Sequence, residues 1–182
     1  MKKYEFTGET KRVELWNRTA TLHRIKATVE FGFVKVGELG GWIEKEENLS
    51  HEGKAWVWGN AKVCGDAKVC GDAKVCGDAK VCGDAEVCGD AKVWGNANVC
   101  GNAEVFLASH VLVMGSVGSR NDFTTFFRDK DNEITVKCGC FLGKIDKFLE
   151  KVTQTHGNNK YALVYRAAVE VAKLQIELTE RK

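Results

Sequence analysis

The sequence predicts a mainly β protein built around a solenoid of stacked coils, and three observations lead to this prediction. The chain repeats every six residues from Ala55 to Asn102, most often as Ala-Lys-Val-Cys-Gly-Asp. Valine stands at every sixth position from Val57 to Val117, always two residues after an Ala, Ser or Gly. Glycine followed by Asp or Asn ends each repeat, and this pair is typical of turns. Such repetition is the sequence signature of a repeat architecture.

Side chains within one repeat alternate as on a strand, so Ala and Val share the inner face while Lys and Cys share the outer face. A strand of four residues cannot bury its apolar face alone, so we expect the coils to stack. The motif resembles the hexapeptide repeat of left-handed parallel β-helices. This resemblance implies three hexads in each triangular coil, so that residues eighteen apart stack at about 4.8 Å.

The regions on either side of the repeats are expected to cap the solenoid, because its ends would otherwise expose unpaired strand edges. Residues 1–35 read as short strands and form the expected N-terminal β cap. The left-handed β-helix is expected over residues 36–117. Its first coil contains a two-residue insertion, because Leu49 and Val57 stand eight residues apart instead of six.

Residues 118–143 are expected to form a loop and a β-hairpin. The two hairpin strands, Phe123–Phe127 and Glu133–Cys138, flank a polar turn at residues 128–132. The rich content of Phe, Ile, Thr and Val in these two runs favours strand over helix.

Two helices are expected over residues 144–182. The first has apolar residues at helical spacing and is followed by Gly157, a residue type that commonly ends helices. Asn158 or Asn159 is suited to cap the second helix, which is expected to run to about Glu180. The second helix carries two apolar stripes, which indicates packing on the body of the protein and on a second subunit.

Composition limits the classes of partner. The net charge of +2, with 29% charged residues, favours neither nucleic-acid binding nor an acidic tail. No apolar run approaches the roughly 18 residues of a membrane span, and the N-terminus leads into charged residues rather than an apolar signal core. We therefore expect no nucleic-acid or membrane partner, and a cytoplasmic location, which the resemblance to phage proteins given below would place in a bacterial host cell.

Six of the eight cysteines occupy one outward position of the repeat. Stacking places Cys64, Cys82 and Cys100 in one column and Cys70 with Cys88 in another. Parallel side chains in register point the same way, which disfavours good disulfide torsions, and a column does not converge as a zinc site requires. We expect reduced cysteines, no metal and no cofactor.

One outer face of the solenoid is expected to be aromatic, because Trp56, Trp58 and Trp94 fall on it. Exposed aromatic patches are typical of contact surfaces, and either a terminal cap or another subunit would cover this one. A homo-oligomer is expected, a trimer by the triangular cross-section of the resembled fold, although two-fold dimers are commoner. The candidate interface residues are Trp56, Trp58, Trp94, Leu112, Tyr161, Tyr165, Leu174 and Leu178.

Hexapeptide-repeat acyltransferases resemble the predicted architecture and use a histidine as general base at a trimer interface. His110 is the best placed histidine for this role, on the aromatic face near the end of the solenoid. A base needs an orienting partner and a substrate cleft, and the sequence contains neither a long extruded loop nor an evident coenzyme A site. A structural role is expected for each histidine.

A further resemblance covers segments outside the repeats, including Leu39-Gly-Gly-Trp-Ile-Glu44, Gly118-Ser-Arg-Asn121 and Cys138-Gly-Cys-Phe141. These segments are similar to hexapeptide-repeat proteins of bacteriophages and prophages. The resemblance implies a phage-carried role such as counter-defence, by blocking a host protein or sequestering a signalling nucleotide. A phosphate could then be held by an arginine fork and turn amides, and the candidate ligand-binding residues are Ser119, Arg120, Asn121 and Thr124.

Three functions of different class follow. The first is a non-catalytic binding or assembly module. The second is an acyltransferase-like enzyme with His110 as base. The third is a self-assembling structural β-helix, which the non-repeat segments at both ends disfavour because they are able to cap it.

Overall fold

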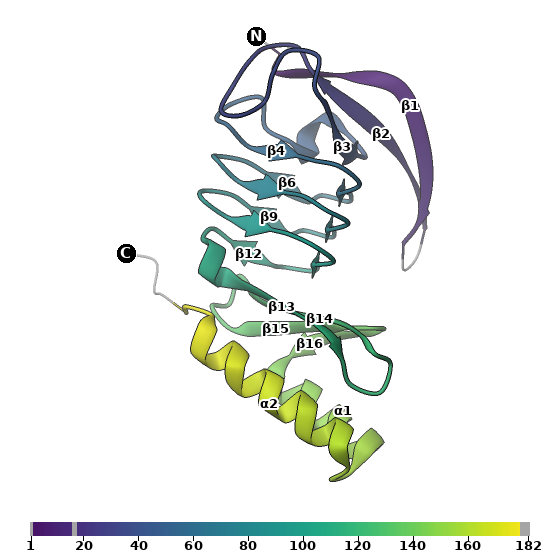
Figure 1. Ribbon diagram of the computed structural model, residues 1–182, viewed down its shortest axis with the longest axis vertical. Coiled ribbons are helices and arrows are strands. Elements are labelled where there is room, and N and C mark those ends of the chain that lie inside the picture. Colours follow the sequence, from purple (N-terminus) through teal and green to yellow (C-terminus); the bar gives the residue numbers. More distant parts are fainter. Residues whose placement is uncertain (1, 16–17, 179–182) are drawn as a thin grey trace.

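The computed structural model describes residues 2–15 and 18–178. It is elongated, with a β-hairpin at one end, a stack of parallel coils in the middle, and a small sheet carrying two helices at the other end (Figure 1). The predicted mainly β architecture with stacked parallel coils and two C-terminal helices is confirmed. None of the helices in the described part of the chain is long and apolar enough to cross a membrane.

Two-residue strands build the coils and pair in parallel register with the strand eighteen residues away, as Lys62 does with Lys80 and Lys80 with Asn98. Three ladders result, in the orders β3-β5-β8-β11, β4-β7-β10 and β6-β9-β12. The strands are β3 (Leu39–Ile43), β4 (Trp56–Val57), β5 (Lys62–Val63), β6 (Lys68–Val69), β7 (Lys74–Val75), β8 (Lys80–Val81), β9 (Glu86–Val87), β10 (Lys92–Val93), β11 (Asn98–Val99) and β12 (Glu104–Val105).

The interior of the coils is filled by the alanines and valines of the repeat, which are buried throughout from Ala55 to Val105. The predicted inside and outside of the repeat are therefore correct. Glycine is required at the corners: Gly71 has φ 66°, and a Cβ added there would lie 2.8 Å from the backbone nitrogen of Gly89 on the next coil.

The first coil contains the predicted two-residue insertion. Ile43 pairs with Val63 and Leu49 bridges to Val69, so the offset is twenty residues instead of eighteen. The extra residues follow a 3-10 turn, η1 (Glu46–Asn48).

The parallel stack ends at Val105, rather than at Val117 as predicted. Leu107 stands where the earlier repeats have a corner glycine, and a 3-10 turn, η2 (Ala108–His110), follows. The chain then enters an antiparallel sheet in the order β13-β14-β15-β16. Its strands are β13 (Val111–Val117), β14 (Asp122–Arg128), β15 (Ile134–Cys138) and β16 (Phe141–Lys144). Because Val111 and Val117 continue the period of six, the sequence did not reveal this change of pairing.

Helices α1 (Ile145–His156) and α2 (Lys160–Gln175) pack on this sheet, and their shared core contains Phe126, Phe148 and Val169. The side chain of Asn159 accepts hydrogen bonds from the backbone of Tyr161 and Ala162, so it is the N-cap of α2. Helix α2 ends at Gln175, earlier than predicted, and Glu180 lies outside the described residues.

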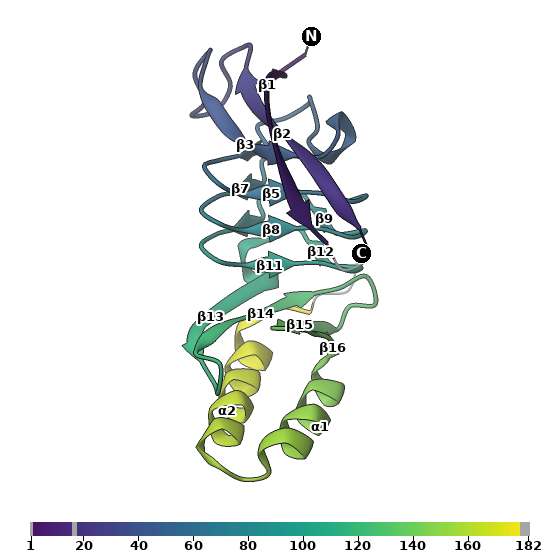
Figure 2. The same ribbon diagram turned by 90° about the vertical axis from the view of Figure 1, so that its right-hand side faces the viewer.

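The N-terminal strands β1 (Tyr4–Glu14) and β2 (Thr19–Ala27) form an antiparallel hairpin, and β2 also pairs with β3 of the first coil. The hairpin does not simply close the end of the solenoid. It leans along the outer side of the β3-β5-β8-β11 ladder (Figures 1 and 2), where Leu22 packs with Trp42 and Cys64.

Candidate functional site

The candidate site lies on the outer face of the β4-β7-β10 ladder. Parallel register stacks Trp56, Lys74 and Lys92 on neighbouring strands. The next outward position carries Trp58 and Trp94, one coil above and one coil below Cys76. The predicted aromatic face therefore exists, and it carries a lysine column as well.

Trp56 is not part of the open surface, and its prediction as an interface residue is wrong. Its side chain is fully buried. The ring of Phe31 packs edge-on at 5.4 Å between centroids, and the ring of Tyr4 packs at 6.1 Å. Both residues come from the N-terminal segment, so the cap covers the first tryptophan of this face and leaves Trp94, 54% exposed, uncovered.

A groove of about 450 Å³ runs along this face beside Trp58. We call it the aromatic–lysine groove. Its lining residues are Gly32, Phe33, Val34, Lys54, Trp58, Asp72, Lys74, Asp90, Lys92 and Ala108. Phe33 is 84% exposed, which is unusual for a large apolar side chain in a protein surface.

Lysine ammonium groups in the groove lie over aromatic rings. The Nζ atom of Lys74 is 4.9 Å from the ring centroid of Phe33, and that of Lys92 is 5.8 Å from the ring of Trp94. Asp72 forms an ion pair with Lys54 at 3.6 Å. Within the described residues, neither Lys74 nor Lys92 forms an ion pair.

Lys74 and Lys92 are direct register partners on adjacent strands. Like charges directly opposite each other in a sheet are unfavourable, and a bound anion would offset this repulsion. Histidine, serine and cysteine are not among the residues that line the groove. The arrangement is therefore suited to hold a planar, negatively charged group rather than to activate a nucleophile.

His110 is buried, so its predicted outward position on the aromatic face is wrong. The η2 turn, which replaces a regular corner, directs the ring inward, where Nδ1 accepts a hydrogen bond from the backbone of Phe106. Its Nε2 atom is buried and has no hydrogen-bond partner among the residues that the structure describes. Burial, and then the charge of Arg128, lower the pKa of His110. A buried ring in this position has no access to a substrate.

The candidate ligand-binding residues after the solenoid do not form one surface. Ser119, Arg120 and Asn121 lie exposed in the turn between β13 and β14, and the hydroxyl of Ser119 is 3.4 Å from His156 Nε2. Thr124 is fully buried and donates to the sulfur of Cys138 at 3.2 Å. Its prediction as a ligand-binding residue is wrong, because β14 turns it toward the helices.

The interface candidates in the C-terminal part of the chain also include both buried and exposed residues. Tyr165 is buried against Phe148, with 5.5 Å between ring centroids, and cannot serve as a contact residue. Leu112 and Tyr161 are half-buried. Leu174, by contrast, is 90% exposed. It belongs to a row of exposed apolar residues on α2, which we call the α2 seam: Val164, Ala167, Val171 and Leu174. Leu178 is also exposed but lies beyond the end of the helix.

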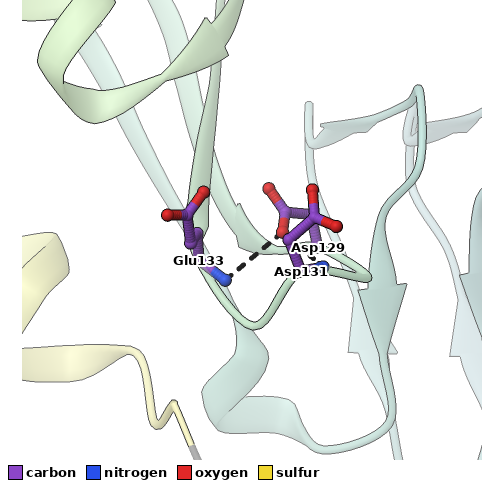
Figure 3. A group of neighbouring side chains, drawn as sticks. All are labelled: Asp129, Asp131 and Glu133. Carbon is purple, nitrogen blue, oxygen red and sulfur yellow. Dashed lines mark hydrogen bonds between the residues drawn. The ribbon is translucent and has the colours of Figure 1, made fainter.

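Three neighbouring carboxylates, from Asp129, Asp131 and Glu133, lie at the turn between β14 and β15 (Figure 3). Lys144 Nζ contacts all three, at 2.6, 3.2 and 2.7 Å. Asp129 also accepts hydrogen bonds from the backbone of Asp131 and Glu133 and from the Thr135 hydroxyl. Burial alone would raise the pKa of Asp129, but the bonds from Lys144 and Thr135 lower it. Lys144 pairs with all three carboxylates, so the cluster stabilises the turn between β14 and β15.

The cysteine columns have the predicted membership, but the prediction that all cysteines are reduced is wrong. Cys70 and Cys88 form a disulfide across adjacent coils, with 4.5 Å between their Cα atoms. The free cysteines are Cys64, Cys76, Cys82, Cys100, Cys138 and Cys140. The stacking distance that the sequence implied is therefore short enough for a bridge between in-register residues.

Comparison with known proteins adds no relatives: no protein-family model matches the chain, and no curated protein is significantly similar to it. The structure itself defines the class, a β-solenoid capped at both ends. Its surface carries an open groove of aromatic rings and lysines on one face.

Proposed function

We propose that the protein is a non-catalytic binding module that captures an anionic ligand with a planar ring, of the nucleotide class, in the aromatic–lysine groove. The observation that carries this proposal is the pair of stacked lysines, Lys74 and Lys92, each lying over an exposed aromatic ring. In this arrangement a phosphate neutralises the two ammonium groups. The base then stacks on Phe33 or Trp58.

The size and chemistry of the groove support this class of ligand. Sites for small molecules commonly enclose about 300–1,000 Å³, and the groove encloses about 450 Å³. Stacking of a base on an aromatic side chain contributes about 1–3 kcal/mol. Lysine binds phosphate as a point charge, so the groove selects for charge and ring rather than for one base.

The resemblance to hexapeptide-repeat proteins of bacteriophages suggests where this binding activity would be used. A left-handed solenoid with three hexads per coil, made in an infected bacterium, would sequester a host signalling nucleotide and so act in counter-defence. The acyltransferase alternative has less support, because His110 is buried. A host protein docking on the same face is the competing outcome of the binding test.

Titration of the full chain with AMP, ATP and cyclic AMP, followed by tryptophan fluorescence and calorimetry, tests the proposal. All three should bind and quench Trp58 or Trp94, whereas adenosine and inorganic phosphate should bind at least about tenfold more weakly. Lys92→Ala should weaken binding about tenfold. Lys68→Ala, at the same repeat position on another face, is the matched control. Equal loss in both variants, or no binding at millimolar nucleotide, would contradict the proposal.

We also propose that the chain self-associates through the α2 seam. Its members Val164, Ala167, Val171 and Leu174 follow the alternating spacing of three and four residues that is typical of a helix that pairs with a second copy of itself. Leu174 at 90% exposure is the strongest single support, and the small net charge of +2 opposes assembly little. The resembled fold favours a trimer, and light scattering distinguishes this from a two-fold dimer.

A further inference from the structure

A column of free cysteines runs up the outer side of the β5-β8-β11 ladder. Cys64 and Cys82 follow strands that pair directly, as do Cys82 and Cys100. Their surroundings differ along the column. Cys64 is fully buried beneath Trp42 and the β1–β2 hairpin, Cys100 is 6% exposed, and Cys82 between them is partly exposed.

The open part of this column forms the floor of a pocket of about 640 Å³, which we call the thiol pocket. Figure 2 faces this side of the molecule: the β1–β2 hairpin crosses β5 and β8, and β15 and β16 lie beyond β11. The lining residues are Glu14, Leu15, Arg18, Gly65, Lys80, Cys82, Gly83, Asn98, Cys100, Gly101, Lys137, Cys140 and Leu142. Cys82 and Cys100 open into it, whereas Cys64 does not.

The pocket carries positive charge next to its thiols. Lys80 lies on β8, two residues before Cys82, and Lys137 lies on β15. Both lysines line the pocket. Hydrogen bonds from the thiols of Cys100 and Cys64 lower the pKa of Cys82, and the charges of the two lysines act in the same direction against burial. The same bonds raise the pKa of Cys64 and Cys100. These contacts favour the thiolate form at Cys82 over the same form at Cys64 and Cys100.

The neighbouring ladder, β6-β9-β12, contains a disulfide between two cysteines that are stacked in the same way. Cys70 and Cys88 occupy the same repeat position, are eighteen residues apart, and form a disulfide across adjacent coils. Cys82 and Cys100 are also eighteen residues apart and follow the paired strands β8 and β11. The solenoid thus accommodates a disulfide between thiols related in this way.

We propose that Cys82 and Cys100 form a thiol–disulfide exchange site that reduces a small, carboxylate-bearing disulfide, such as glutathione disulfide, bound in the thiol pocket. Cys82 Sγ, as thiolate, attacks one sulfur of the ligand, whose S–S bond breaks. One ligand sulfur leaves as thiolate and takes a proton from water, and the other remains joined to Cys82.

The second step closes the protein disulfide. The thiol of Cys100 gives its proton to water and attacks Cys82 Sγ, which breaks the mixed disulfide. The second ligand sulfur leaves as thiolate and takes a proton from water. Two protein thiols are oxidised by two electrons in total, and the ligand disulfide is reduced to two thiols. Lys80 and Lys137 attract the carboxylates of the ligand, and Cys64 positions the Cys82 thiolate through its hydrogen bond.

Incubation of the full chain with glutathione disulfide at pH 7, acid quenching and mass spectrometry test the proposal. The two cysteines lie in the distinct tryptic peptides 81–92 and 93–120. Peptide 81–92 also contains Cys88, which is already bonded to Cys70 in peptide 69–74, so the new bridge is read from a species that joins all three peptides. Wild type should lose two hydrogens and yield a cross-link between these peptides without a lasting adduct. A Cys64→Ser, Cys100→Ser double variant should accumulate the mixed disulfide on Cys82. Cys82→Ser should yield neither product.

Cys76→Ser is the matched control, because Cys76 stacks between Trp58 and Trp94 and should not change the reaction. Lys137→Ala should slow the reaction with glutathione disulfide roughly fivefold, and more than the reaction with uncharged hydroxyethyl disulfide, because it removes the attraction for the ligand carboxylates as well as part of the charge that favours the thiolate. Circular dichroism verifies that each variant is folded. A cross-link formed by folded Cys82→Ser, or an adduct that forms first on Cys140, would overturn the proposal.

Discussion

The side-chain amide of Asn48 donates a hydrogen bond of 2.8 Å to the carbonyl of Ala67 on the next coil. It donates a second bond to Gly65, and its oxygen accepts from the backbone of Glu44 and Lys45. One fully buried polar side chain thus satisfies four backbone groups where the first coil departs from the repeat.

Replacing this residue should destabilise the solenoid at its first coil. Asn48→Ala leaves two donors and two acceptors without that partner, and we expect a loss of about 3 kcal/mol in the free energy of unfolding. Chemical denaturation followed by circular dichroism measures it. Glu47→Ala, on the exposed side of the same turn, should change stability by less than about 0.5 kcal/mol. Equal effects would mean that the turn is not held by the Asn48 network.

Charge on the α2 seam should prevent self-association. Leu174→Glu combined with Val171→Glu places carboxylates on the seam, and light scattering should then report a monomer with unchanged circular dichroism. Lys151→Glu, exposed on α1, is the control and should leave the oligomer intact. A monomeric wild type at micromolar concentration would contradict the assembly proposal.

Stability should decline as the pH falls from 7 toward 5, because a buried histidine, His110, and a half-buried one, His51, must then gain a charge. The pKa of His110 is lowered by burial and by Arg128, with Glu177 acting in the opposite direction. Burial also lowers the pKa of His51. The unfolded chain therefore binds protons first, near the ordinary histidine value of about 6.5, so the stabilisation is complete above that pH and is lost below it.

Thermal melts between pH 5 and 8 check this dependence. His110→Asn keeps an acceptor for the Phe106 amide and removes the titrating ring, so its melting temperature should fall less between pH 7 and 5 than that of wild type. Melts at pH 8, where both rings are neutral, separate any general destabilisation by the substitution. A wild-type melting temperature that is constant or rises toward pH 5 would refute the prediction.

The carboxylate cluster at the β14–β15 turn should depend on Lys144 and not on a metal ion. Lys144→Met removes the ammonium group shared by Asp129, Asp131 and Glu133, and we expect a loss of about 1–2 kcal/mol. Neither calcium nor EDTA should shift the melting temperature of wild type. Lys147→Met, whose ion pair with Glu150 is exposed, is the control. A calcium-dependent wild-type melt would show that the cluster holds an ion.

The repeat by itself determined the central architecture. A period of six with alternating side chains decides which residues face inward, and stacking then decides the columns. Counting residues along the repeat is enough to predict that Val81 faces inward and that Cys82 and Cys100 share a column. It also predicts the two extra residues in the first coil, where Ile43 pairs with Val63 at an offset of twenty instead of eighteen. Because capping is local in sequence, the cap of α2 could be narrowed to Asn158 or Asn159, and the structure has it at Asn159.

Only the tertiary structure decided which outward residues stay at the surface. Trp56 and Trp94 occupy the outer side of the same ladder, yet one is fully buried and the other 54% exposed. The difference comes from Phe31 and Tyr4, which are distant in sequence and fold back over the first coil. Periodicity carries no information about such contacts.

The same reason accounts for the incorrect predictions near the end of the solenoid. Val111 and Val117 keep the spacing of six, but β13 pairs with β14 in an antiparallel sheet instead of adding to a parallel ladder. The antiparallel sheet buries Thr124 on β14, the two helices that pack on it bury Tyr165, and the η2 turn buries His110. The aromatic–lysine groove and the thiol pocket likewise join segments far apart in the chain, because the non-repeat ends fold back along a stack whose own geometry is local.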